Sequence, residues 1–153
     1  MESYSVTVRW TGNLGEGTRE YRGYSRAHVL EFPDKPPILA SSGMGARVDP
    51  HRVNPEELLV GALASCHMLW YLHLCAEAGV VVVEYSDRAS GELELSADGT
   101  GRFARATLRP RVVVATGDPD IAARLHVEAH RRCFIASSVN FPVGIEPTIE
   151  TTT

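Results

Sequence analysis

Apolar and polar residues alternate with different periods along the chain, and each period predicts one element. Residues 4–10, YSVTVRW, alternate with a period of two, which is typical of a half-buried strand. Turn-forming residues follow in TGNLGEG, so we expect a hairpin whose return strand is residues 18–24. The run RAHVLEF at residues 26–32 predicts a third strand, and the prolines of PDKPP end it.

The longest apolar stretch, residues 54–80, predicts a central helix. Asn54 suits the N-cap, Pro55 suits the first helical position, and Glu57 lies three residues after the cap, as in a capping box. Gly79 is a typical helix end. The preceding segment, SSGMGARVDPHRV, has no periodicity and is long enough to indicate a functional loop.

Nearly all faces of this helix are apolar, which predicts burial at the centre of a protein or between two copies of it. A membrane span is the alternative, because residues 58–76 approach the length of about 20 apolar residues that a bilayer requires. His67, His73 and Glu77 argue against a span, and the sequence has no second segment of this kind. Since one small sheet cannot cover such a helix, we infer a homodimer.

The remainder of the chain predicts strands and a second helix. VVVVEY is typical of a buried strand, and ASGELELSA and RFARATLRPRVVVAT predict an antiparallel pair around DGTG, with Pro110 at an edge or a bulge. Asp118 and Pro119 begin a helix that reaches Cys133, and NFPVGIEPTIE predicts a terminal strand. This order indicates an α+β fold, one domain over residues 1–153, with antiparallel sheets packed around the central helix.

Composition limits the binding partners and the cellular compartment that the sequence predicts. The 153 residues carry a net charge of −4 without a basic stripe, so we expect no nucleic-acid partner and no membrane partner. The opening residues, MESYSVTVRW, lack the basic and apolar segments that direct export, which predicts a cytoplasmic protein. Three cysteines, an odd number, argue against a permanent disulfide framework in that compartment.

The two cysteines of the central helix cannot pair with each other. Cys75 follows Cys66 by nine residues, so the two point about 180° apart and lie about 13 Å apart along the axis. Both can simply be small buried hydrophobic residues, and packing explains Cys75. A thiol in apolar surroundings has a raised pKa and needs a neighbouring cation to react at pH 7. His67 points about 100° away from Cys66, so an arginine must come from elsewhere.

Cys133 ends the second helix, after His130, Arg131 and Arg132. The negative end of the helix dipole disfavours its thiolate, whereas the arginines favour it. Such a thiol suits a resolving role better than that of a first nucleophile. The alternative is a core residue at the end of the helix.

Histidines near the cysteines leave a metal site as an alternative. His126 and His130 share one face of the second helix, and zinc held by Cys66, Cys133 and a histidine has suitable ligand types. No CxxC or HExxH motif supports such a site. Buried, hydrogen-bonded side chains explain His130 and His67 more simply.

Two motifs resemble the OsmC/Ohr family of thiol peroxidases: NPEELLVGALASCH at residues 54–67 and EAHRRCFIASSV at residues 128–139. The opening VRWTG and the stretches YSRAHVLEF and YLHLCAEAGVVVVEYSDRASGELE are similar to an OsmC-like subgroup. The resemblance covers nearly the whole chain. It implies the OsmC-like fold, an intertwined homodimer, and the reduction of organic hydroperoxides by two cysteines.

The resemblance also implies residue roles. Cys66 matches the family's peroxidatic cysteine, Cys133 its resolving cysteine, and Glu56 its active-site glutamate. Glu56 and Cys66 lie about 15 Å apart along one straight helix, so a shared site would combine Glu56 of one protomer with Cys66 of the other. The alternative for Glu56 is a first-turn carboxylate that only favours the helix dipole.

The family's arginine has several candidates in this sequence. Arg47 lies in the loop before the NPEE motif, as in OsmC proteins, one residue from the expected spacing. Arg22 or Arg26 corresponds to it if the chain follows the Ohr plan, in which the arginine comes from the first hairpin.

The resemblance implies a complete cycle. The arginine stabilises the Cys66 thiolate, which attacks the hydroperoxide and becomes a sulfenic acid, and Cys133 condenses with it to a disulfide. A dithiol reductant of lipoyl or thioredoxin type restores both thiols, and no flavin, haem or metal is required. Leu59, Leu63 and Trp70 predict an apolar wall that favours substrates with a hydrocarbon tail. The alternative function is a non-catalytic dimer of the same fold that binds an apolar ligand or partner.

Overall fold

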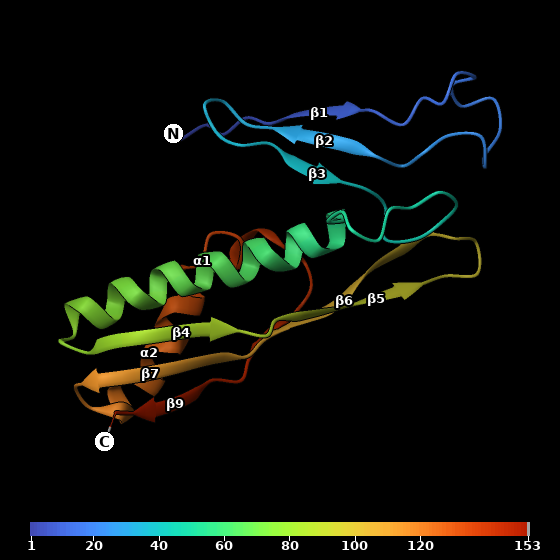
Figure 1. The fold of residues 1–153 in the computed structure, drawn as a ribbon. Helices are drawn as coiled ribbons and strands as arrows, with labels where there is room; N and C mark the ends of the chain where they lie inside the picture. The colour runs from blue at the N-terminus through green and yellow to red at the C-terminus, as the bar shows by residue number, and fades with distance from the viewer. Residues whose placement is uncertain (153) are drawn as a thin grey trace. The chain divides into compact units, whose positions relative to one another are not determined.

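The computed structural model describes residues 1–152 (Figure 1). The elements along the chain are β1 (Thr7–Trp10), β2 (His28–Glu31), β3 (Ile38–Ala40), α1 (Pro55–Glu77), β4 (Val81–Asp87), β5 (Ser90–Leu95), β6 (Gly101–Leu108), β7 (Pro110–Thr116), α2 (Pro119–Arg132), the short 3₁₀ helix η1 (Ala136–Ser138), β8 (Val143–Ile145) and β9 (Thr148–Thr151). The chain divides into two compact units, Met1–Leu58 and Leu59–Thr153, which we call the N-terminal unit and the C-terminal unit.

The N-terminal unit contains the antiparallel sheet β1-β2-β3. β1 begins only at Thr7 and pairs with β2, the predicted third strand. The predicted strand at residues 18–24 is wrong, because this segment forms turns instead. The Asn13 side chain accepts hydrogen bonds from the backbone N–H groups of Gly15 and Gly17, and both glycines have positive φ angles. This local turn chemistry outweighs strand pairing here. The short strand β3 was not predicted.

The start of α1 follows the predicted capping box. The Glu57 N–H donates to Asn54 Oδ1 at 2.8 Å, and the Asn54 N–H donates to Glu57 Oε2 at 3.0 Å. These bonds satisfy backbone donors that the first helical turn leaves free. The helix ends at Glu77, and Gly79 adopts a φ of 70°, as predicted for the helix end. The predicted loop at residues 41–53 contains neither a helix nor a named strand.

The C-terminal unit contains two sheets, β4-β7-β9 and β5-β6-β8. The predicted hairpin of β5 and β6 is confirmed. The long segment that contains it, residues 102–116, is two strands rather than one, because the chain passes from one sheet to the other at Arg109. Pro110 begins β7, the middle strand of its sheet, so its assignment to an edge or a bulge is wrong. A proline is tolerated as the first residue of a strand.

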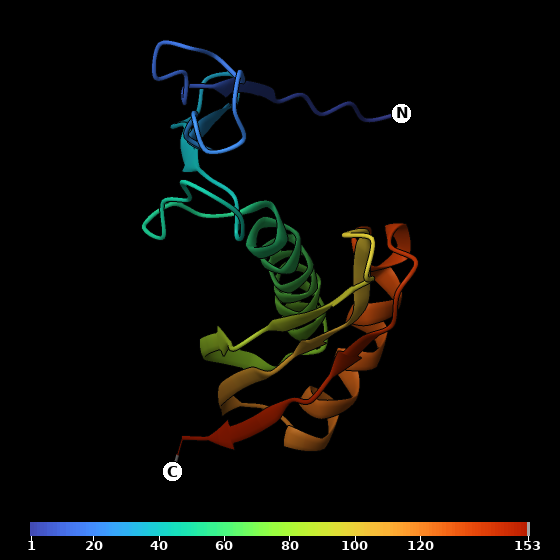
Figure 2. The ribbon, with the colours of Figure 1, turned by 90° about the vertical axis from the view of Figure 1, so that its right-hand side faces the viewer.

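The last segment also forms two strands instead of the predicted one. β8 pairs in parallel with β6, and β9 pairs in parallel with β7. Both sheets are therefore mixed, and the expected antiparallel pairing holds for β1-β2-β3, for β4 with β7 and for β5 with β6. The helix α2 lies between β7 and these strands in the sequence, and such a crossover is what parallel pairing requires. Figure 2 shows α2 beside β9.

Two apolar clusters hold the C-terminal unit together. The larger one joins α1, α2 and the β4-β7-β9 sheet through Tyr71, Leu74, Val112, Val114 and Ala129, all buried. The smaller one packs Leu63 of α1 against Ala106 and Leu108 of β6. The predicted α+β class, with sheets and a second helix packed on a long apolar helix, is confirmed.

Candidate active site

The structure brings Cys66 and Cys133 together. Cys66 lies in the middle of α1 and is half-buried, and Cys133 is the C-cap residue of α2 and is 1% exposed. The Cys66 thiol lies close enough to Cys133 to raise the pKa of the Cys133 thiol. All three cysteines are free thiols, and Cys75 is buried at a separate place, beside the Tyr71 hydroxyl. Two helices therefore deliver one thiol each to a single point, 67 residues apart in the chain.

Cys133 is held as a neutral thiol. Burial, together with the neighbouring Cys66 thiol, raises its pKa to about 11, although a hydrogen bond of 3.4 Å from the Ala136 N–H to Cys133 Sγ opposes the shift. The sequence suggested that the neighbouring arginines favour the Cys133 thiolate, and this expectation is wrong. Arg131 and Arg132 bind Glu128 instead, at 2.7 and 2.6 Å, so their charge is directed away from the thiol.

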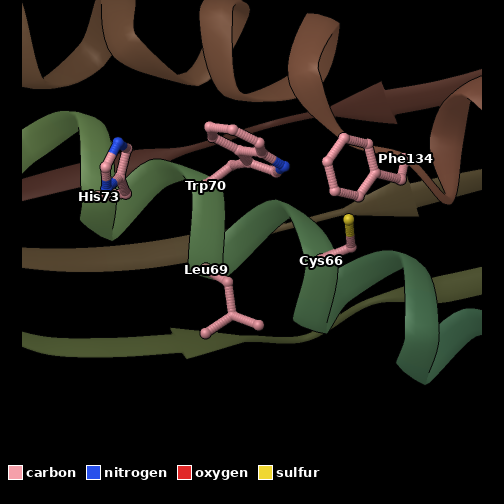
Figure 3. Close-up of a pocket in the computed structure, with 5 residues that line it drawn as sticks. All are labelled: Cys66, Leu69, Trp70, His73 and Phe134. Carbon is pink, nitrogen blue, oxygen red and sulfur yellow. The ribbon is translucent and has the colours of Figure 1, made fainter. Parts of the chain in front are cut away.

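A pocket of about 320 Å³ opens beside Cys66 (Figure 3). Leu69, Trp70 and His73 line it from α1, and Phe134 lines it from the residue after Cys133. These α1 residues follow Cys66 by three, four and seven positions, so they share its helix face. Figure 3 shows the Cys66 sulfur pointing toward the Phe134 ring. The pocket thus exposes one of the paired thiols to an apolar space.

Aromatic rings shape this pocket. Trp70 makes edge-to-face contacts with Phe134 and His73, at ring-centre distances of 5.6 and 5.7 Å. Arg132 stacks over the outer part of the wall, with its guanidinium carbon 5.6 Å from the Trp70 ring centre. Phe134 is 69% exposed, so the mouth is open.

Of the three residues predicted to form an apolar wall, only Trp70 lines the pocket. Leu63 is 1% exposed and packs in the smaller core cluster, away from the pocket, and Leu59 does not line it. Sequence reasoning missed Leu69 and Phe134. The helical spacing from Cys66 was a signal for Leu69, whereas nothing in the sequence fixed which face of α1 the sheet would cover.

The three candidate arginines lie in one cluster of the N-terminal unit. The Arg26 guanidinium stacks on Tyr24 and Tyr21, at 3.9 and 4.6 Å from the ring centres, and donates to their carbonyl oxygens. The Arg26 N–H donates to the Arg47 carbonyl at 3.3 Å, and Arg47 Nε donates to the Arg22 carbonyl. Arg47 is exposed and has a φ of 53°, an uncommon left-handed conformation for a residue other than glycine.

Glu56 belongs to the same unit. It is half-buried in the first turn of α1, and its Oε2 lies against the loop at Gly43, where an added Cβ atom would come within 3.4 Å. In residues 1–152, Glu56 forms no ion pair with any arginine of the chain. The N-terminal unit therefore groups Glu56 and the arginines, and the C-terminal unit holds the paired thiols.

A histidine pair joins α1 to α2, the helices whose residues carry or end at the two thiols. His67 Nε2 and His126 Nδ1 form a hydrogen bond of 2.9 Å, with the imidazoles 0% and 2% exposed. Burial, with a smaller contribution from a neighbouring histidine in each case, lowers the pKa of His67 to about 4 and that of His126 to about 3. Tyr71 stacks on His126 at a ring-centre distance of 3.8 Å. Both imidazoles are thus neutral at pH 7.

Within the described residues, histidine, cysteine and carboxylate side chains form no group of three or more that is suited to a metal ion. The zinc alternative needed Cys66, Cys133 and a histidine at one point. The structure instead pairs the thiols with each other and the histidines with each other.

Fold and site together define an α+β thiol protein with a two-cysteine centre, and similarity assigns the family. The family model described as OsmC-like protein matches residues 48–148. The chain belongs to this family. Its α1 helix is long and apolar enough to cross a membrane by length and composition, yet proteins of this family are generally soluble.

The chain is similar to several solved structures. An OsmC-like protein of unknown function from Vibrio cholerae shares 35% identity, covers 97% of this chain and 100% of its own, and gives a TM-score of 0.87. An organic hydroperoxide resistance protein from Bacillus subtilis shares 18% identity, with 96% and 98% coverage and a TM-score of 0.65. One from Legionella pneumophila shares 12%, with 98% coverage of both chains and a TM-score of 0.63. Among curated proteins, none matches this chain.

Proposed function

We propose that this protein is a cysteine-based peroxidase that reduces organic hydroperoxides. The observation that carries the proposal is the contact between Cys66 and Cys133 at the edge of an apolar pocket. Two thiols held in contact can pass between a dithiol and a disulfide without large movement. The family of the chain includes cysteine peroxidases, and two of its structural neighbours are named for resistance to organic hydroperoxides.

The first step belongs to Cys66, because its side chain reaches the pocket whereas Cys133 is buried. The Cys66 thiolate attacks the outer oxygen of the hydroperoxide, the O–O bond breaks, and the alkoxide takes up a proton and leaves as an alcohol. Sulfur is oxidised by two electrons to the sulfenic acid. The Leu69, Trp70 and Phe134 side chains favour substrates with an apolar organic group over hydrogen peroxide.

The second step joins the thiols. The Cys133 thiol attacks the Cys66 sulfenic acid, the S–O bond breaks, and the thiol proton leaves with the hydroxyl group as water. The resulting disulfide is then reduced by two electrons from an external dithiol of lipoyl or thioredoxin type, through a mixed disulfide. The neutral state of Cys133 suits this order, because the protonated thiol does not compete for peroxide.

Activation of Cys66 uses a second copy of the chain. Proteins of this family are generally homodimeric, and Glu56 and Cys66 of one copy are separated by about 15 Å of helix. We assign Glu56 the role of holding a guanidinium beside the Cys66 thiolate of the partner copy. Arg47 is the first candidate because it is exposed, whereas the Arg26 guanidinium is already stacked between tyrosines. Arg22 is the remaining candidate.

Apolar surface supports the dimer. On α1, Gly61, Ser65 and Leu69 follow one another at intervals of four and form an exposed stripe. In the N-terminal sheet, Val8 and Trp10 lie on one face of β1 and are 61% and 42% exposed. Surfaces of this kind are usually covered by another chain. A cytoplasmic location agrees with three free thiols.

Turnover of cumene hydroperoxide with dihydrolipoamide tests the proposal. The Cys66→Ser protein should lose at least about 100-fold in rate, because no other pocket residue can be oxidised in this way. Cys75→Ser is the matched control and should retain activity, since Cys75 is buried elsewhere. Retained activity in Cys66→Ser would refute the assignment.

A non-catalytic dimer that binds an apolar ligand is the second candidate. The open, largely apolar pocket favours it, because Phe134 and Leu69 are 69% and 64% exposed and suit contact with a hydrophobic molecule. Thiol counting separates the two functions. One equivalent of cumene hydroperoxide removes two thiols per chain from a peroxidase and none from a binder.

A further inference from the structure

The His67–His126 hydrogen bond connects the two helices that bring the thiols together. Among residues 1–152 it is the one hydrogen bond that joins a side chain of α1 to a side chain of α2. His67 follows Cys66 directly, and His126 precedes Cys133 by seven residues, which is about two helical turns. Along the helices, the bond therefore lies next to Cys66 on α1 and about 10 Å from Cys133 on α2.

This polar pair stands in an apolar core, where it is costly. The outer nitrogens, His67 Nδ1 and His126 Nε2, are buried and have no protein hydrogen-bond partner. Leaving such groups unpaired opposes folding, and apolar side chains of similar shape would avoid the penalty. A hydrogen bond offers what apolar packing does not: it fixes distance and direction between two helices.

Rigid surroundings preserve that geometry. The two imidazoles are nearly parallel, with an interplanar angle of 9°, and the Tyr71 ring lies parallel to His126 at 8°. Both histidines are neutral, so the bond persists with a single shared N–H across neutral pH. The two helices that carry the thiols are thus held in one register by a bond next to Cys66 and two turns before Cys133.

Disulfide formation depends on that register. The Cys66 and Cys133 thiols are close neighbours, but a disulfide requires their sulfur atoms about 2 Å apart, with a defined dihedral angle. A small shift of α2 along α1 changes both quantities. The approach of the sulfurs is therefore sensitive to the contact that sets the register.

We propose that His67 and His126 are positioning residues, whose hydrogen bond sets the approach of the Cys66 and Cys133 sulfurs and so favours the disulfide. The inference rests on the proposed function for its biological meaning, since a peroxidase needs a rapid second step. Its physical content is narrower: the bond raises the effective concentration of one thiol toward the other.

A glutathione redox buffer measures this effective concentration without any peroxide. The fraction of Cys66–Cys133 disulfide at equilibrium is read by mass spectrometry of alkylated full-length protein. His126→Leu should lower the equilibrium constant for the disulfide by about 10-fold, which corresponds to about 30 mV. His126→Asn keeps a hydrogen-bonding atom at the position of Nδ1 and should restore the constant to within about threefold of the wild type.

His130→Leu is the matched control, because it removes a neighbouring imidazole of α2 that lies closer to Cys133 in the chain but does not form this bond. It should stay within about twofold of the wild type. If His126→Leu folds poorly by near-ultraviolet circular dichroism, the double variant His67→Leu/His126→Leu removes both polar groups and takes its place. An unchanged constant in the leucine variants, or an equal loss in His130→Leu, would overturn the proposal.

A separate measurement keeps the two proposals apart. Trapping of the Cys66 sulfenic acid with dimedone after one equivalent of cumene hydroperoxide tests peroxidase chemistry in the wild type. Absence of the adduct and of disulfide would contradict the proposed function, while the glutathione equilibrium would still decide the role of the histidine pair.

Discussion

In the C-terminal unit, Tyr71, Leu63 and Val112 are 0–1% exposed, and their neighbours on both helices and two sheets are buried with them. In the N-terminal unit, Val8 is 61% exposed and Trp10 is 42% exposed, although both lie on strands of a regular sheet. A three-stranded sheet needs a covered apolar face for stability. The C-terminal unit therefore supplies its own core, whereas the N-terminal sheet leaves apolar residues exposed, and we infer that a second copy covers them.

The same division runs through the proposed site. Cys66 and Cys133 lie in the C-terminal unit, where packing within one chain already brings the thiols into contact. Glu56 and Arg47 lie in the N-terminal unit, where no described ion pair joins them. We infer that one chain alone forms the Cys66–Cys133 dithiol, whereas activation of Cys66 requires two chains.

Acid should have the largest effect on stability, through the buried histidine pair of the C-terminal unit. The folded-state pKa values of His67 and His126, about 4 and about 3, lie below the ordinary value of 6.5. Below pH 6.5 the unfolded chain therefore takes up protons that the folded chain does not. The free energy of unfolding should fall by up to about 1.4 kcal/mol per pH unit for each histidine, on the order of 5 kcal/mol in total by pH 4.

Urea unfolding at pH 7.5, 6.5, 5.5 and 4.5 measures this loss. Stability should be constant above pH 6.5 and decline below it. The His67→Leu/His126→Leu protein should show a clearly flatter profile. A wild-type profile that is flat between pH 6.5 and 4.5 would contradict the buried, neutral state of the pair.

Matched truncations sharpen the comparison of the cores. Leu63→Ala should cost about 2–5 kcal/mol of unfolding free energy, because it opens a cavity in a closed core. Val8→Ser should cost about 1–2 kcal/mol when a second copy covers the N-terminal sheet. Urea unfolding at several protein concentrations distinguishes them, since the loss in Val8→Ser should shrink on dilution, as both proteins dissociate, whereas that in Leu63→Ala should be similar at all concentrations. A concentration-independent, negligible effect of Val8→Ser would show that nothing covers this sheet.

Glu56→Gln tests the contribution of the N-terminal unit to chemistry. Loss of the carboxylate should slow formation of the Cys66 sulfenic acid by about 10-fold, because the guanidinium is held less firmly. Glu57→Gln is the control, since glutamine also completes the capping box. Stopped-flow measurement with cumene hydroperoxide gives both rates. Equal rates in the two variants would reduce Glu56 to a residue that only favours the helix dipole.

Removing a helix N-cap should have the smallest effect on stability, and the cost should be similar in the two units. Asn54→Ala removes the cap of α1, and Asp118→Ala removes that of α2, where the Asp118 side chain accepts from the Asp120 N–H at 2.8 Å. Each should cost about 1 kcal/mol. Thermal unfolding of the two variants provides the measurement, and a cost several times larger for one of them would show that its cap also supports tertiary packing.

Local chemistry was predictable from the sequence. Asn54, Glu57 and Asp118 act within one helical turn, so their sequence positions suffice to place both helix starts. The pairing of Cys66 with Cys133 was inferred from resemblance, and spacing alone did not give it. The face of α1 that receives the sheet was not predictable, which explains why Leu63 was assigned to the pocket and Leu69 was overlooked.

Long-range pairing was the other limit. The strands β8 and β9 find parallel partners far earlier in the chain, and no local residue marks that choice. Residues 18–24 have strand-like composition, yet turns anchored by Asn13 and the tyrosine contacts of Arg26 prevail there. Sequence periodicity describes which residues are apolar, and tertiary contacts decide which of them meet.

Oxidation of the wild-type protein by one equivalent of cumene hydroperoxide, followed by peptide mapping under non-reducing conditions, tests the central claim most directly. The account predicts the loss of two thiols per chain, a single link between the peptides that contain Cys66 and Cys133, and recovery of both thiols with dihydrolipoamide. Intact thiols after exposure to the peroxide, or a link that involves Cys75, would contradict it.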